Sequence, residues 1–195
     1  MTGDYYPCYA SDGCEDLILL WKKVQQGKFS KIIVSEQKWK ELKYSKIHSA
    51  ERAFAGFGCS FSGVFFHGYV NDSNGKKTYD IAYQSIKDIE DEIKNISFSH
   101  KDYKDYNKII RKGEYLIYCD PPYDNTECEF GSNFEFNTEE FWKIIKQWKK
   151  WGNIVIISEK KAPKEFKCIW EKSKFNFLKT TRNDKQSNFL DKLFI

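Results

Sequence analysis

The sequence has few of the residues that build metal centres, disulfide frameworks or membrane spans. Its six cysteines are scattered without a C-x-x-C pair, and its three histidines are equally dispersed, so no familiar zinc-site spacing can be assembled and we expect no metal site. No run of about 18 apolar residues occurs, and the N-terminus lacks the basic start and apolar stretch of a secretory signal. We therefore expect an intracellular protein with reduced thiols and no membrane association.

Arginine is also scarce, because only three of the 32 cationic residues are arginine and the rest are lysine. The formal net charge is +4, which permits a polyanionic partner without requiring one. Aromatic residues are abundant at 17%, and hydrophobic residues reach 41% of the 195 residues. This composition and length predict one folded domain with a packed core and exclude a linker or a low-complexity tail.

Expected strands and helices alternate along the chain, which indicates an α/β sheet. Apolar residues at helical spacing predict helices that begin at Glu15 and Tyr79. A third helix is expected to follow Thr138 as its N-cap, with its buried face formed by Phe141, Trp142, Ile144, Ile145 and Trp148. Short apolar or aromatic runs predict strands over 5–11, 98–103, 115–119, 153–158, 166–170 and 192–195. The run 153–158 shows almost no alternation, which is typical of a strand buried on both faces of a parallel sheet.

The stretch 28–78 departs from this alternation. A lysine-rich part, 35–46, is expected to be helical, and a glycine- and aromatic-rich part, 52–69, follows it. The second part fits no regular amphipathic element. We interpret 28–78 as a compact, loop-rich insertion that turn residues close at 71–75.

The most informative stretch is Asp120-Pro121-Pro122-Tyr123, directly after the expected strand 115–119. Ligands of open α/β sheets bind at the carboxyl ends of strands, and two consecutive prolines take the chain out of the sheet there. The Asp120 carboxylate and the Pro121 carbonyl can accept hydrogen bonds from an amino group, and the Tyr123 ring can stack. These groups suit a nucleobase with an exocyclic amine. A rigid turn capped by Asp120, with Tyr123 on the surface, is the alternative.

With this motif, the chain resembles the Dam-type adenine-specific DNA methyltransferases, especially their phage and viral members. The resemblance covers nearly the whole chain and rests on segments in family order: Tyr9–Asp12 with Asp16–Ile18, Gly56–Gly63, Phe98–Tyr103, Asp120–Tyr123 and Asn153–Pro163. It implies a Rossmann-like S-adenosylmethionine-dependent methyltransferase sheet that lacks its first strand. The implied arrangement is one partial methyltransferase domain, 1–195, with an inserted DNA-recognition region, 28–78.

The resemblance also implies a reaction on double-stranded DNA, serving restriction protection or regulation. A target adenine is flipped out and stacked against Tyr123. Asp120 and the Pro121 carbonyl, stiffened by Pro122, accept hydrogen bonds from its amine. The amine nitrogen then attacks the sulfonium methyl of S-adenosylmethionine in line. A viral member would act in the host cytoplasm or nucleus.

The same similarity assigns the cofactor site. Asp12 would hold the cofactor's ribose hydroxyls, and Asp102, with Tyr103 beside it, would meet its adenine amine. From the residues alone, Asp12 could instead cap a turn or a helix, and Asp102 could be a solvated loop residue.

Contacts with DNA are expected from the region 28–78. Arg52 and the lysines of 38–46 are candidates for phosphates, and Phe61 with Ser62 for packing against bases or the backbone. For any single lysine, a solvated helix face is the commoner role.

Dam-type enzymes carry a first strand and a glycine-rich cofactor loop before the strand that ends at Asp12, whereas this sequence starts almost at that strand. The glycines around Gly56 come later and belong to the insertion. We favour a fragment whose N-terminal part is lost or encoded separately, so that a partner chain supplies the loop. The alternatives are an inactive relative that still binds DNA and a nucleic-acid-binding module without catalysis.

Overall fold

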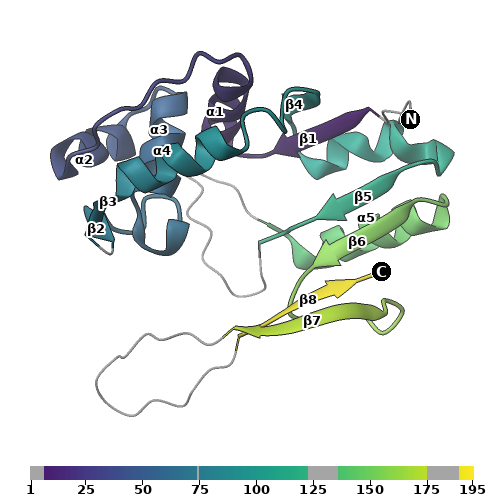
Figure 1. Cartoon of the computed structure of the whole chain (residues 1–195). Coiled ribbons are helices and arrows are strands. Elements are labelled where there is room, and N and C mark those ends of the chain that lie inside the picture. Colours follow the sequence, from purple (N-terminus) through teal and green to yellow (C-terminus); the bar gives the residue numbers. More distant parts are fainter. Residues whose placement is uncertain (1–6, 74, 123–135, 175–188) are drawn as a thin grey trace, which may run out of the picture. The chain divides into compact units, whose positions relative to one another are not determined.

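The computed structural model describes residues 7–73, 75–122, 136–174 and 189–195 (Figure 1). These residues form two compact units, one from the residues up to Tyr103 and the other from Lys104 onward. Both units combine helices with small sheets, so the expected mixed α/β class is confirmed.

The sheet of the first unit has two parallel strands, β1 (Cys8–Asp12) and β4 (Ile96–His100). Asp12 is paired in register with His100, so the two strands end at the same edge. Helix α1 (Glu15–Gln25) follows β1, and its first turn carries the two acidic residues that the sequence places there, which favourably meet the positive helix end. The helix buries Asp16, Ile18, Leu20 and Val24.

The region 28–78 is more helical than the sequence indicates. It contains α2 (Glu36–Tyr44) and α3 (Ala50–Gly58), then the short hairpin of β2 (Asp72–Ser73) and β3 (Lys76–Lys77), and α4 begins at its end (Thr78–Asp88). The Ser35 and Ser49 hydroxyls accept the backbone N–H groups of the third helical residues at 3.1 Å, which fixes where α2 and α3 start.

The expectation of irregular structure was wrong for 52–58, which belongs to α3, because two glycines were taken as loop signals. Gly56 and Gly58 lie in the last turn of α3 and allow close packing. A Cβ on Gly56 would come within 2.6 Å of Phe65 Cδ2, and one on Gly58 within 2.7 Å of Ala82 Cβ. A cluster of buried residues fills this unit: Leu20, Val24, Phe29, Val34, Trp39, Ala50, Ala53, Phe54, Ala55, Cys59, Phe65, Phe66, Ile86 and Ile93.

The second unit contains a four-stranded sheet in the order β5-β6-β8-β7. Strands β5 (Leu116–Cys119) and β6 (Ile154–Ser158) are parallel, whereas β8 (Phe189–Phe194) runs antiparallel to both β6 and β7 (Cys168–Lys174). Helix α5 (Thr138–Lys150) buries Phe141, Ile145 and Trp148, as its spacing predicts. Its cap is Asn137, whose side chain accepts the Glu140 N–H at 2.9 Å, and not the expected Thr138.

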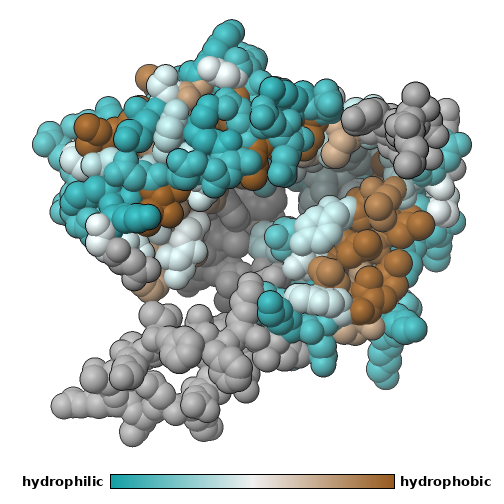
Figure 2. All heavy atoms as spheres, in the orientation of Figure 1, coloured by the Kyte–Doolittle hydropathy of each residue, from teal (hydrophilic) through white to brown (hydrophobic). Residues whose placement is uncertain are grey.

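One face of this sheet is buried and the other is exposed. Val155 and Ile157 of β6 have no exposed surface, whereas Ile154 is 55% exposed and its register partner Leu116 is 71% exposed. Figure 2 shows hydrophobic surface gathered over β5 and β6 on this second face. The parallel pairing of 153–158 is therefore confirmed, but its burial on both faces is not.

Two glycines bring the ends of α5 and β5 together in the second unit. Gly113 adopts a left-handed φ of 71°, and a Cβ there would collide with the Trp151 carbonyl and lie 3.2 Å from Gly152 Cα. Only glycine fits this close backbone approach. Among the described strands, the ladders form three separate sheets, and one continuous Rossmann-like sheet lacking a first strand stays a prediction.

Candidate functional site

Two candidate cofactor residues lie at the carboxyl edge of the first unit's sheet. Asp12 is the last residue of β1, and Asp102 comes two residues after the end of β4. Both side chains are partly buried, as is that of Tyr103. Because parallel strands present their carboxyl ends at one edge, β1 and β4 bring these residues to the same side of the sheet.

The Asp12 carboxylate is held in a defined position. Its Oδ1 accepts the Cys14 N–H at 2.6 Å, which forms the turn into α1. Burial raises the pKa of Asp12, and the Cys14 N–H and the nearby His100 offset part of that rise. The turn role that the sequence allows for Asp12 is thus present in the structure.

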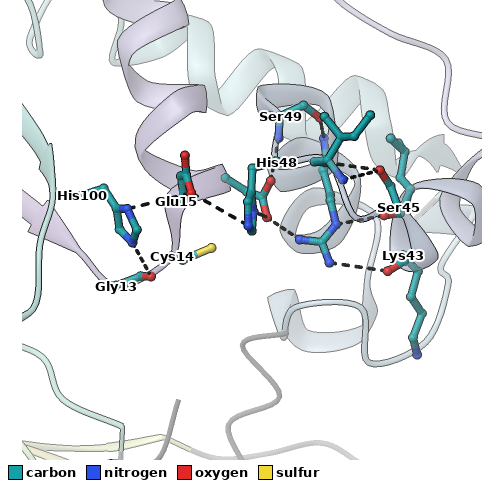
Figure 3. A network of polar contacts seen from close by, with 12 residues as sticks. Gly13, Cys14, Glu15, Lys43, Ser45, His48, Ser49 and His100 are labelled. Carbon is teal, nitrogen blue, oxygen red and sulfur yellow. Dashed lines mark hydrogen bonds and ion pairs between the residues drawn. The ribbon is translucent and has the colours of Figure 1, made fainter. Parts of the chain in front are cut away.

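A buried network connects α1 to the helices of region 28–78 (Figure 3). The Asp16 carboxylate is 1% exposed and pairs with the Arg52 guanidinium, which is 8% exposed as a residue. Asp16 also accepts the Ser49 N–H at 2.6 Å and lies 3.1 Å from His48 Nδ1. Arg52 in turn donates from Nε to the Leu42 carbonyl at 3.0 Å.

The network changes the interpretation of Arg52. Its guanidinium lies over the rings of Phe65 and Phe66, at 5.1 and 5.3 Å from their centroids, and donates to a backbone carbonyl of α2. The expected phosphate contact needs an exposed cation. The structure places this one inside the unit, so we do not carry Arg52 forward as a DNA contact.

Glu15 lies between two histidines beside this edge (Figure 3). Its Oε2 is 3.8 Å from His48 Nε2 and 4.0 Å from His100 Nδ1. His100 Nε2 is 3.1 Å from the Gly13 carbonyl, which ties the end of β4 to the turn after β1. These contacts are half-exposed, and they add polar groups to the surroundings of Asp12.

Phe61 and Ser62 lie in an exposed turn that follows α3. Phe61 is 46% exposed, and Ser62 adopts a left-handed φ of 55°, which is uncommon for a residue other than glycine. The Phe61 N–H donates to the Gly68 carbonyl at 2.9 Å, and Ser60 pairs with Tyr69, so the turn is closed at its base. An aromatic ring is thereby held on the surface.

The second unit holds the Asp-Pro-Pro part of the motif. Asp120 follows β5, so it lies at the carboxyl edge of the parallel pair β5 and β6, and Pro121 and Pro122 then leave the sheet. The Asp120 residue is exposed, yet partial burial of its carboxyl raises its pKa, the Ser158 hydroxyl lowers it by hydrogen bonding, and Asp191 raises it. Tyr123 lies outside the described residues.

Sequence reasoning had assigned no role to two residues that the structure singles out. Asp16 looked like an ordinary first-turn acid of α1, and nothing local signals its partner Arg52 at a distance of 36 residues along the chain. Ser158 ends a buried strand beside Asp120. A polar residue at the end of a strand neighbouring the motif strand is a signal that could have identified it.

Two searches of the described residues bear on cofactors and location. No group of three or more His, Cys, Asp and Glu side chains in this part of the chain could hold a metal ion. None of the described helices has the length and apolar character to cross a membrane.

The comparison with protein families identifies the chain. The family model described as D12 class N6 adenine-specific DNA methyltransferase matches residues 65–186. This span is more than half of the chain and includes Asp120–Tyr123 and Asp102, whereas Asp12 precedes it. No curated protein matches the chain. The protein thus belongs to the D12 class N6 adenine-specific DNA methyltransferase family.

Proposed function

We propose that the protein transfers a methyl group from S-adenosylmethionine to the exocyclic amine of adenine in double-stranded DNA. The observation that carries this proposal is the position of Asp120 at the carboxyl edge of β5 and β6, within the span that matches the family. Open α/β sheets bind their ligands at this edge. The family match supports methyl transfer to adenine, and the position at the carboxyl edge of β5 and β6 supports Asp120 as a residue of the target site.

The proposed target site is Asp120, Pro121, Pro122 and Tyr123. The Asp120 carboxylate and the Pro121 carbonyl would accept the two amine hydrogens of a flipped adenine, and Tyr123 would stack on its ring. Neither proline has an N–H, so neither competes for these acceptors. Two fixed acceptors increase electron density on the amine nitrogen and align it for attack.

The proposed cofactor site uses Asp12, Asp102 and Tyr103. The donor set fits part of the cofactor, because carboxylates at a sheet edge accept hydrogen bonds from ribose hydroxyls and from an adenine amine. Asp12 Oδ1 accepts the Cys14 N–H, which fixes the orientation of the carboxylate. When bound, S-adenosylmethionine supplies an electrophilic methyl group.

We also propose that a glycine-rich segment, on this chain or a partner chain, completes the cofactor site. The described carboxyl edge of β1 and β4 contains one glycine, Gly13, whose carbonyl is within hydrogen-bond distance of His100. In the described ladders β1 pairs only with β4, and β5 pairs only with β6. Each strand can therefore accept another neighbour.

For DNA, we propose that Phe61 and Ser62 contact the duplex. Their turn is exposed, closed at its base, and part of the region 28–78 that the family resemblance assigns to recognition. In the same region, Lys38 and Lys40 of α2 have half-exposed side chains that pair with Glu41 and Glu36 of their own helix and can also approach phosphates.

The experiment is a methyl-transfer assay with radiolabelled S-adenosylmethionine and the full chain. One substrate is a duplex of mixed sequence, and the control is poly(dG)·poly(dC), which contains no adenine. We expect label in the first duplex, recovered as N6-methyladenine, and its loss in Asp120→Ala. Asp105→Ala, which replaces an exposed aspartate of the same unit, should retain activity.

The possible negative results have different meanings. Calorimetric binding of S-adenosylmethionine that is lost in Asp12→Ala, with no transfer, would indicate a cofactor-binding relative without activity. DNA binding without cofactor binding would refute the enzymatic proposal for this chain alone. Transfer that survives Asp120→Ala would refute the assignment of the target site.

A further inference from the structure

The neighbour of Asp120 in the sheet is Ser158. Cys119 of β5 and Ile157 of β6 are paired in register, so Asp120, directly after β5, lies beside Ser158, the last residue of β6. Ser158 is only 8% exposed, and its hydroxyl forms a hydrogen bond with the Asp120 carboxylate. A buried hydroxyl on a half-covered carboxylate restricts the directions in which that carboxylate can point.

Charged groups from the adjoining strands surround this pair. Strand β8 contributes Asp191, whose negative charge acts on Asp120, and Lys192, which lies 3.5 Å from Glu171 of β7. Strand β6 is followed by Glu159, which is 6% exposed and accepts the Lys160 N–H at 2.7 Å. On β5 itself, burial and the Asp120 charge raise the pKa of the Cys119 thiol to about 12, so that thiol stays neutral.

We propose that Ser158 is a positioning residue for Asp120. Its hydroxyl donates to the carboxylate and holds it at the carboxyl edge of the sheet, and this hydrogen bond favours the ionised carboxylate, whereas the charge of Asp191 disfavours it. The inference rests on the proposed function in one respect: it assigns Asp120 the role of accepting the substrate amine. The contact itself is a property of the second unit and can be tested without any substrate.

The geometry predicts opposite effects for the two neighbours. Ser158→Ala removes a hydrogen bond to the ionised form, so the pKa of Asp120 rises and the acid limb of the activity profile moves to higher pH. Asp191→Asn removes a repelling charge, so the pKa of Asp120 falls and the acid limb moves to lower pH. A role in folding alone would not move the two profiles in opposite directions.

The test is a carboxyl titration of the full chain labelled with ¹³C at aspartate side chains. The signal that disappears in Asp120→Asn identifies Asp120. We expect its midpoint to rise in Ser158→Ala, to return toward wild type in Ser158→Thr, and to fall in Asp191→Asn. Ser85→Ala removes a hydroxyl that bonds to the Ile81 carbonyl in α4 and should leave the midpoint unchanged.

The outcomes separate this inference from the proposed function. An unchanged Asp120 midpoint in a folded Ser158→Ala variant, judged by circular dichroism, would overturn the positioning role. If Ser158→Ala does not fold, Ser158→Cys replaces the hydroxyl by a weakly donating thiol, and an unchanged Asp120 midpoint in that variant would also overturn the positioning role. The expected shifts in a protein without methyl transfer would uphold the contact while the proposed function fails.

Discussion

The ion pair between Asp16 and Arg52 permits a quantitative prediction. Arg52→Met retains much of the side-chain volume but leaves the Asp16 carboxylate, which is 1% exposed, without its guanidinium. Breaking a buried pair from one side costs about 3–5 kcal/mol, and we expect about 4 kcal/mol here. For a chain of this size that loss lowers the midpoint of thermal unfolding by about 8–16 °C.

The assay is urea unfolding followed by tryptophan fluorescence, since Trp21 and Trp39 lie in the same unit. The matched control is Lys23→Met. Lys23 pairs with Glu51 at 2.5 Å between the same two helices, but the side chains are 41% and 34% exposed. An exposed pair of this kind contributes about 0–1 kcal/mol, so the control should unfold close to wild type.

A second variant tests the reason for the loss. Asp16→Asn combined with Arg52→Met removes both charges, so the double variant should recover part of the stability lost in Arg52→Met. The reasoning fails if Arg52→Met costs no more than Lys23→Met. In that case the guanidinium would be available for a DNA phosphate, and weaker DNA binding by the variant would revive that role.

Three further predictions concern other sites. Gly113→Ala should lower the free energy of unfolding by about 2 kcal/mol more than Gly27→Ala, as measured by urea unfolding. Both glycines have a similar left-handed φ, but only Gly113 faces a backbone carbonyl that an added Cβ would hit. Asp12→Asn should raise the unfolding midpoint at pH 7 but much less near pH 4. Because the pKa of Asp12 is raised in the folded protein, its neutral carboxyl contributes to stability below about pH 3.8, and this contribution is lost as the pH rises through the raised pKa. Maleimide should label exposed Cys8 well before Cys14, because burial raises the pKa of the Cys14 thiol to about 11.

Each of these has an outcome that contradicts it. Equal losses in the two glycine variants would mean that backbone strain, and not the collision, sets the cost. If the unfolding midpoints of Asp12→Asn and wild type differ by the same amount at every pH, the Asp12 carboxyl has the same pKa in the folded and unfolded protein. Labelling of Cys14 as fast as Cys8, measured by mass spectrometry of peptides, would mean that the turn after β1 opens readily.

Local signals were sufficient for the elements with strong periodicity. Helix α5 was predicted from its apolar spacing, and of its expected face the structure buries Phe141, Ile145 and Trp148, while Trp142 and Ile144 are partly buried. Strand β6 was predicted from a run of branched apolar residues as part of a parallel sheet, and the structure pairs it in parallel with β5. For α5 the apolar spacing also identifies the buried face, whereas the unbroken apolar run of β6 identifies a strand without showing which face is buried.

The misjudged elements depend on contacts that are distant in sequence. Gly56 and Gly58 look like helix breakers, but they lie in the last turn of α3, where Phe65 and Ala82 leave no room for a side chain. Arg52 looks like a phosphate contact until Asp16, in another helix, is placed against it. Hydrophobic periodicity shows which face of a helix or strand is apolar, but it does not show which residue of another element packs against that face.

For the candidate site, the sequence located the motif but not its supports. Asp120 could be placed at the end of a strand because two prolines follow it. Ser158 became relevant only through the register of β5 and β6, and the exposed face of that sheet was not expected at all. Whether a strand end has a hydrogen-bonding neighbour is set by strand order, which a local pattern does not encode.

The exposed apolar face of β5 and β6 has a consequence for how the protein behaves in solution. Leu116 and Ile154 form an exposed apolar surface on β5 and β6, and among the described strands β5 pairs on one side only. Such surfaces promote association between chains. The net charge of +4 provides only weak repulsion to oppose this. Salt screens that repulsion further, so sedimentation at rising protein concentration should show self-association that grows with ionic strength, while charged substitutions at Leu116 should suppress it.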